Sequence, residues 1–187
     1  RIKKEKNMRE VASSQDGEGD YSIHRTIYEF EPQRRILSSS RHGKKDVDSR
    51  HFISFPYMYF YVKSQIYSSY HLKCEVFVFE SLWVGFRPTK ITKDHSKIFH
   101  FNMPNQFEDD SFCLGNNFYL DNASKIELEK NIISIWFNSY FEHCHVNIPL
   151  KKGKKINNFF QWENYNQKDI CWTKCKRMTT PQEIVWH

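Results

Sequence analysis

Two stretches rich in aromatic and β-branched residues lie near the middle of the chain. The first runs from His51 to Val62 and reads HFISFPYMYFYV, and the second runs from Leu72 to Glu80. Such residues suit a pleated, half-buried surface. We expect one strand after Pro56 and a second over Leu72–Glu80, where apolar residues alternate onto both faces. The fold should therefore be built around an antiparallel sheet.

One helix is expected after this sheet, from Ser124 to about Tyr140. Glu127 follows Ser124 by three positions, as in a capping box. The apolar face of the helix has helical spacing and consists of Ile126, Ile132, Ile133, Trp136 and Phe137. A sheet followed by a helix predicts an α+β domain over residues 51–150, with a four-stranded antiparallel meander and flanking helices.

Both ends of the chain are polar and basic. We expect residues 1–50 to form an N-terminal extension and residues 151–187 a basic, aromatic C-terminal tail. The chain has 28 Lys and Arg against 22 Asp and Glu, a net charge of +6 that favours acidic partners such as nucleic acid. A lysine run opens the tail and is either a solvated face or a contact to phosphate: Lys151, Lys152, Lys154 and Lys155.

The five cysteines form an odd set with no secretory leader in front of them, which predicts an intracellular, reducing compartment rather than a disulfide framework. The apolar stretches are much shorter than a bilayer span, so we expect no membrane association. His143, Cys144 and His145 with Cys171 and Cys175 have irregular spacing for a zinc site. We therefore expect neither a metal nor a cofactor.

The order of motifs resembles that of the ubiquitin-conjugating enzyme family. A Pro-containing crossing, a short strand, a Pro-Asn pair, an acidic turn and a Cys-Leu pair follow one another, and the Asn precedes the Cys by eight positions. These motifs are Arg87–Thr92, Lys97–His100, Met103-Pro104-Asn105 and Cys113-Leu114, with Asn147–Leu150 resembling the end of the family's core. The resemblance covers roughly 100 residues, and Cys-Leu-Gly is similar to the phage- and plasmid-encoded prokaryotic branch.

The resemblance implies a fold, a chemistry and a set of partners. Cys113 would carry a ubiquitin-like modifier as a thioester, received from an activating enzyme, and pass it to an amine. Asn105 would donate a hydrogen bond to the oxyanion or hold the loop that does so. Asp121 would accept the amine proton, and His143 would join the site in the prokaryotic branch. A degenerate relative would keep the fold without the activity.

Each of these residues also has a structural interpretation. Cys113 could be a buried small residue, Asn105 a turn residue, and Asp121 a favourable charge at a helix N-terminus. His143 could interact with the last carbonyls of the helix. The alternative function is that of a structural subunit in a nucleic-acid-containing assembly, such as a ribosome or virion, which uses basic aromatic arms. An exposed Cys113 beside Asn105 would favour the enzyme, and a buried one would favour the subunit.

Overall fold

In the computed structural model, the described part of the chain comprises residues 8–18, 20–40, 49–69, 74–114, 125–142 and 145–185. Within it, 54% of the residues lie in strands and 14% in helices. The fold is thus mainly β, and the expected α+β fold of the ubiquitin-conjugating type, with its flanking helices, is wrong. Residues 8–40 account for part of this difference, because they form three long strands.

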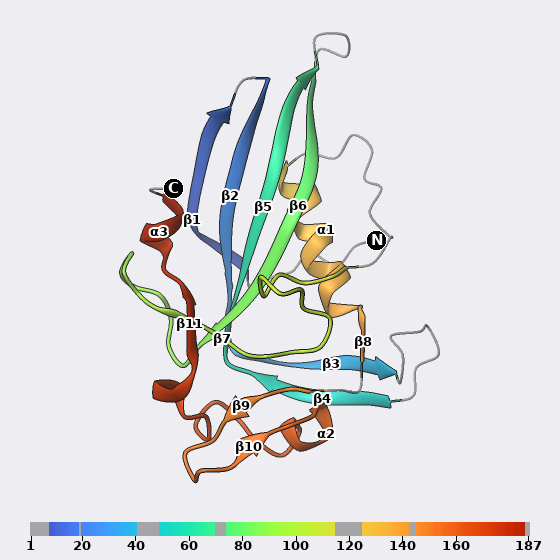
Figure 1. The fold of residues 1–187 in the computed structure, drawn as a ribbon, viewed down its shortest axis with the longest axis vertical. Helices are drawn as coiled ribbons and strands as arrows, with labels where there is room; N and C mark the ends of the chain where they lie inside the picture. Colours follow the sequence, from blue (N-terminus) through green and yellow to red (C-terminus); the bar gives the residue numbers. More distant parts are fainter. Residues whose placement is uncertain are drawn as a thin grey trace.

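The largest element is a curled antiparallel sheet of six strands (Figure 1). Its order across the sheet is β1 (Met8–Glu18), β2 (Tyr21–Phe30), β5 (Tyr57–Ser69), β6 (Cys74–Arg87), β7 (Ile98–His100) and β11 (Lys176–Thr179). The predicted strand after Pro56 is β5. The part of the predicted strand Leu72–Glu80 that is described, from Cys74 on, lies in β6, which continues to Arg87. Leu72 and Lys73 are outside the described residues.

Side-chain alternation gives the sheet two apolar faces. On one face, Tyr28 pairs with Phe60 and Phe60 pairs with Val84, and all three residues are buried. On the other face lie Ile27 and Tyr59, which are also fully buried. A strand that is covered on both faces has a nearly continuous run of apolar residues in its sequence. This explains the apolar composition around Pro56.

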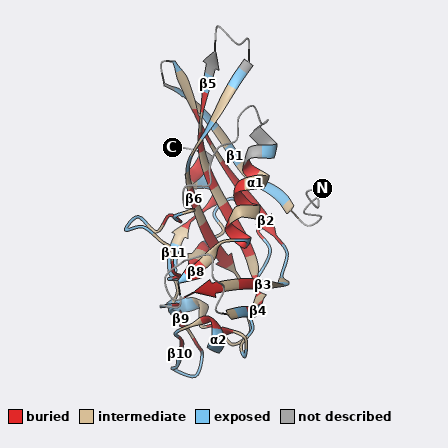
Figure 2. Ribbon diagram, turned by 90° about the vertical axis from the view of Figure 1, so that its right-hand side faces the viewer, coloured by how far each residue is buried: buried red, intermediate tan, exposed pale blue. Residues whose placement is uncertain are grey.

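The larger core lies between the first face and α1 (Lys125–Phe137) (Figure 1). Trp136 of α1 is fully buried, and its ring lies 5.4 Å from that of Phe60 and 5.6 Å from that of Phe112. The helix expected from Ser124 to about Tyr140 is therefore present, but it ends at Phe137, and Tyr140 begins a strand. Ser124 is outside the described residues. Figure 2 shows buried residues concentrated where α1 and β3 lie against the sheet.

The smaller core lies on the second face and is covered by α3 (Pro181–Val185) and the segment before β7. Ile184 of α3 joins Ile27, Ile91 and Ile98 there. The Ser14 hydroxyl donates to the Ile184 carbonyl at 2.8 Å. Because α3 follows β11 at one sheet edge and lies against β1 at the other, it holds the curled sheet closed (Figure 1).

A second sheet crosses the lower end of the first (Figure 1). It consists of β4 (Ser49–Phe55), β3 (Gln33–Ser40) and β8 (Tyr140–Glu142), with β3 in the centre. Beneath it lie β9 (Ile148–Pro149), β10 (Lys155–Ile156) and α2 (Phe159–Trp162), and a short 3₁₀ turn (Trp172–Lys174) precedes β11. Phe159 and Trp162 are buried, so the C-terminal region belongs to the core and is not an appended tail.

Candidate functional site

The loop between β7 and α1 brings Cys113 and Asn105 together. The Cys113 amide donates to the Asn105 carbonyl at 2.7 Å, and the Phe107 amide donates to the Ser111 carbonyl at 2.7 Å. The loop is thus a small hairpin with Cys113 and Asn105 opposite each other at its base. Asn105 has φ of +62°, a left-handed conformation that Asn tolerates better than most residues.

Buried side chains and hydrogen bonds hold this hairpin against the body of the protein. The Phe112 amide donates to the Leu82 carbonyl of β6 at 2.8 Å, and the Phe112 ring is buried. The Trp83 indole donates to the Asp109 carbonyl at 3.0 Å. Met103 is also buried, and its amide donates to the Gln106 side chain at 2.9 Å. The base of the hairpin is therefore held on a packed support, as a site residue requires.

Cys113 is exposed and is a free cysteine. The interpretation of this residue as a buried position is therefore wrong. Its thiol can meet a macromolecular partner without any rearrangement of the core. Of the described cysteines, Cys171 and Cys175 are half-buried and also free, and burial raises the pKa of the Cys175 thiol to about 12. A thiol with so high a pKa is a poor nucleophile near neutral pH, so Cys175 does not compete with Cys113.

The Asn105 carboxamide is directed to β8. Its Nδ2 donates to the Tyr140 carbonyl at 3.0 Å, and its Oδ1 accepts from the Glu142 amide at 3.4 Å. In this arrangement the Asn105 carboxamide ties the hairpin to β8. The two roles that the resemblance implies, oxyanion donor and support of the loop, stay predictions. Sequence reasoning missed Tyr140 and Glu142, because both contacts use main-chain atoms that leave no mark on residue type.

The tip of the hairpin is acidic and ordered by local bonds. Asp109 Oδ1 accepts from the Ser111 hydroxyl at 2.6 Å and from the Ser111 amide at 3.0 Å, and these bonds lower the pKa of Asp109. Asp110 lies between Lys176 Nζ at 2.6 Å and His100 Nε2 at 3.5 Å. Burial lowers the pKa of His100, so its imidazole is mainly neutral at pH 7.

Two of the predicted site residues, Asp121 and His143, lie outside the described residues. The four lysines of the predicted phosphate contact are all exposed: Lys151, Lys152 and Lys154 lie between β9 and β10, and Lys155 is the first residue of β10. Within the described ranges, no group of three or more His, Cys, Asp or Glu side chains could hold a metal ion. No described helix is long and apolar enough to cross a membrane.

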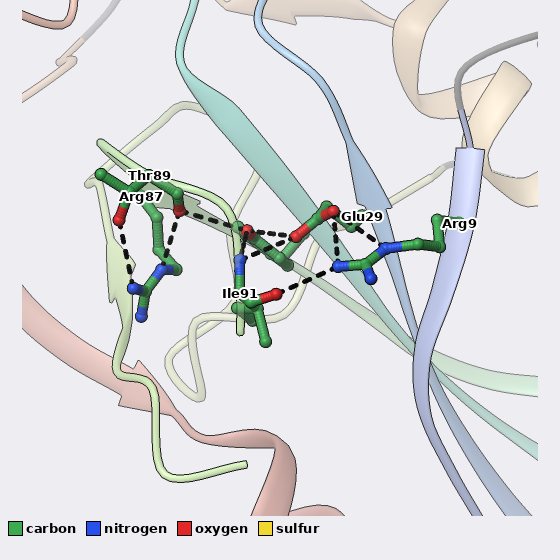
Figure 3. Close-up of polar contacts among 6 residues, drawn as sticks. Arg9, Glu29, Arg87, Thr89 and Ile91 are labelled. Atoms are coloured by element: carbon green, nitrogen blue, oxygen red, sulfur yellow. Dashed lines mark hydrogen bonds and ion pairs between the residues drawn. The ribbon is translucent and has the colours of Figure 1, made fainter. Parts of the chain in front are cut away.

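A second cluster surrounds Glu29 on β2 (Figure 3). This buried carboxylate accepts three hydrogen bonds. The donors are Arg9 Nη2 at 2.8 Å, the Tyr59 hydroxyl at 2.7 Å and the Ile91 amide at 3.0 Å. Burial and the Glu29 hydrogen bond raise the pKa of Tyr59, so its hydroxyl remains a donor. Arg87 Nη1 donates to the Lys97 carbonyl at 2.6 Å. The cluster fixes the segment around Ile91, which covers the smaller core. We therefore assign the cluster a structural role.

A third cluster has the residue types of a hydrolase triad. Ser39 Oγ lies 2.6 Å from His51 Nε2, and His51 Nδ1 lies 3.7 Å from Glu163 Oε1. However, Ser39 is 1% exposed and belongs to the central strand of its sheet, paired on both sides. No substrate carbonyl could reach this hydroxyl in the folded protein. The cluster joins β3, β4 and the end of α2 and is not a nucleophilic site.

Comparisons with protein-family models, with curated proteins and with solved structures found no match to this chain.

Proposed function

We propose that this protein is a thiol-dependent acyl carrier. It accepts the activated C-terminus of a ubiquitin-like protein as a thioester on Cys113 and transfers it to an amine. The observation that carries the proposal is the exposed Cys113 thiol, held at the base of a fastened hairpin through its backbone bond to Asn105. This chemistry needs an accessible thiol on a rigid support and does not require any particular surrounding fold.

The reaction has two steps. In the first, the Cys113 thiolate attacks the acyl carbon of the modifier, a bond from Sγ to that carbon forms, and the bond to the sulfur of the activating enzyme breaks. In the second, the amine nitrogen attacks the same carbon, the Sγ bond breaks, and a proton passes from the amine to solvent or a base. A thiol nucleophile is consumed by oxidation, so we expect the protein in an intracellular, reducing compartment.

The test is to charge the purified protein with an activating enzyme, ATP and a panel of ubiquitin-like proteins, followed by a non-reducing gel. We expect an adduct that reducing agent removes. Cys113→Ser should convert it into an adduct that resists reducing agent, because an ester replaces the thioester. Cys171→Ser and Cys175→Ser are the matched controls and should charge like the parent protein. A thiol-sensitive adduct that survives in Cys113→Ser would contradict the proposal.

Asn105→Ala separates the two roles of this residue. If Asn105 is an oxyanion donor, its replacement by Ala leaves charging normal and slows only the transfer step. Because its carboxamide is bonded to Tyr140 and Glu142, we expect loss of the side chain to loosen the hairpin and to slow both steps. Single-turnover rates of charging and of discharge to free lysine distinguish these outcomes. Binding of a modifier with no adduct would instead indicate a protein that only binds the modifier and has no acyl-carrier activity.

A further inference from the structure

The three-stranded sheet at the lower end of the molecule has one face that is open to solvent (Figure 1). Ile36 on β3 pairs with Phe52 on β4, and these side chains are 46% and 51% exposed. Arg34 on β3 and Arg50 on β4 lie two residues away in opposite directions, and both are exposed. Alternate residues of paired strands share one face of a sheet. These four residues therefore form one surface, which we call the arginine-flanked surface.

The backbone beneath this surface is held by a packed core. Leu37, His51 and Ile53 alternate with the outer residues along β3 and β4, and all three are fully buried on the inner face. The Phe52 amide donates to Glu163 Oε1 at 2.8 Å, which ties β4 to the residue that ends α2. The strands therefore need no further ordering when a partner covers the outer face.

The side chains of this surface favour a protein partner over a nucleic acid. The Arg34 guanidinium lies over the Phe52 ring, 5.6 Å from its centre, within range of a cation–π contact. It thus occupies one face of the ring on which a base could stack, and Ile36 offers no aromatic plane. An apolar pair between two guanidinium groups instead fits an apolar side chain between two carboxylates, which arginine binds through two parallel N–H bonds.

We propose that the arginine-flanked surface docks an acidic protein segment. An apolar side chain lies over Ile36 and Phe52, and a carboxylate meets each arginine. Residues two apart along a strand are separated by about 6.8 Å, in the sheet and in an extended ligand alike, so the matching pattern is acid, any residue, apolar, any residue, acid.

Charge supports this choice of partner. Glu142, the acidic residue of β8, lies two residue pairs along the sheet from Ile36, whereas the arginines adjoin the apolar pair. A second copy of the chain would bring its own two guanidinium groups to the same place, and like charges oppose such a contact. The proposal does not depend on the chemistry at Cys113.

The experiment is a titration of the isotope-labelled full chain with the end-blocked peptide Asp-Ser-Leu-Ser-Asp, followed by amide NMR shifts. We expect saturable shifts confined to β3, β4 and β8. Phe52→Ala should weaken binding by about tenfold or more, because the contact loses a buried apolar side chain. Arg34→Glu with Arg50→Glu should abolish binding of this peptide and create binding of Lys-Ser-Leu-Ser-Lys, since the charges are exchanged on both sides.

Phe107→Ala is the matched control, since it removes a comparably exposed ring, at 57%, from the acidic hairpin, and it should leave the titration unchanged. The peptide Asp-Ser-Ser-Ser-Asp lacks the apolar side chain and should bind about tenfold more weakly or less. Equal shifts with the acidic and basic peptides on the parent protein, or no shifts with either, would overturn the proposal. So would self-association that Phe52→Ala abolishes, or binding of a single-stranded oligonucleotide to the same residues in place of the acidic peptide.

Discussion

Glu129 of α1 is fully buried against β2. The Tyr28 hydroxyl donates to its Oε2, and the Thr26 hydroxyl donates to its Oε1 at 3.3 Å. Burial raises the pKa of Glu129 to about 8, with a smaller contribution from the charge of Glu10 on β1. The carboxyl is therefore mainly protonated at pH 7 in the folded protein. In the unfolded chain it ionises near its ordinary pKa of 4.5.

This difference makes the stability of the protein depend on pH. Between pH 4.5 and about 8 the folded state binds a proton that the unfolded state lacks, so the free energy of unfolding falls as the pH rises. The expected slope from this group is about 1.4 kcal/mol per pH unit. Glu129→Gln keeps a neutral side chain of the same shape and should flatten the profile in this range. Urea denaturation at several pH values measures the effect.

Glu127→Gln is the matched control for that experiment. Glu127 belongs to the same helix but is exposed, so its replacement should leave the pH profile of the parent protein in place. If Glu129→Gln and the parent protein lost stability in parallel from pH 5 to pH 8, the buried carboxyl would not be the titrating group.

Gly85 allows β6 and β7 to approach each other closely. A Cβ atom at this position would lie 2.3 Å from Ile98 Cγ2 and 2.9 Å from Met178 Cε. Met178 can move, but Ile98 is branched at Cβ and fully buried. We expect Gly85→Ala to destabilise the protein by about 1–3 kcal/mol through overpacking. Thermal or urea denaturation provides the measurement.

Gly17→Ala tests whether that effect arises from the contact or from the residue type. Gly17 also lies in a strand, β1, but nothing would lie within 4 Å of an added Cβ atom. We expect a change within about 0.5 kcal/mol, as for most exposed substitutions. Equal losses in the two variants would show that the approach of β7 to Gly85 is not the cause.

At the scale of the whole molecule, α3 closes the curled sheet by packing Ile184 into the smaller core. Ile184 is 3% exposed and contributes to the cluster that contains Ile27 and Ile98. Removal of such a side chain leaves a cavity, and we expect Ile184→Ala to cost about 2–5 kcal/mol. Gln182→Ala, on the exposed side of the same helix, should cost little. If both variants had the same urea midpoint, α3 would not contribute to closure.

Local periodicity alone determined part of this protein. The apolar runs around Pro56 and after Leu72 predict β5 and β6, because alternation depends only on neighbouring residues. The helical spacing up to Phe137 predicts α1 for the same reason. The interval between Asn105 and Cys113 came from the family resemblance and not from periodicity, and one short hairpin carries both residues in the structure.

Contacts between distant segments decided the rest. The polar residues of β1 form a strand because β2 offers them an edge to pair with, and strand propensity is too weak to reveal such pairing. The same holds for Ile184, which meets Ile27 only after the sheet has curled, and for the Asn105 carboxamide, which binds main-chain atoms of β8. These interactions depend on which surfaces the fold brings together, so the tertiary structure, and not the local sequence, turned an expected α+β domain into a mainly β protein.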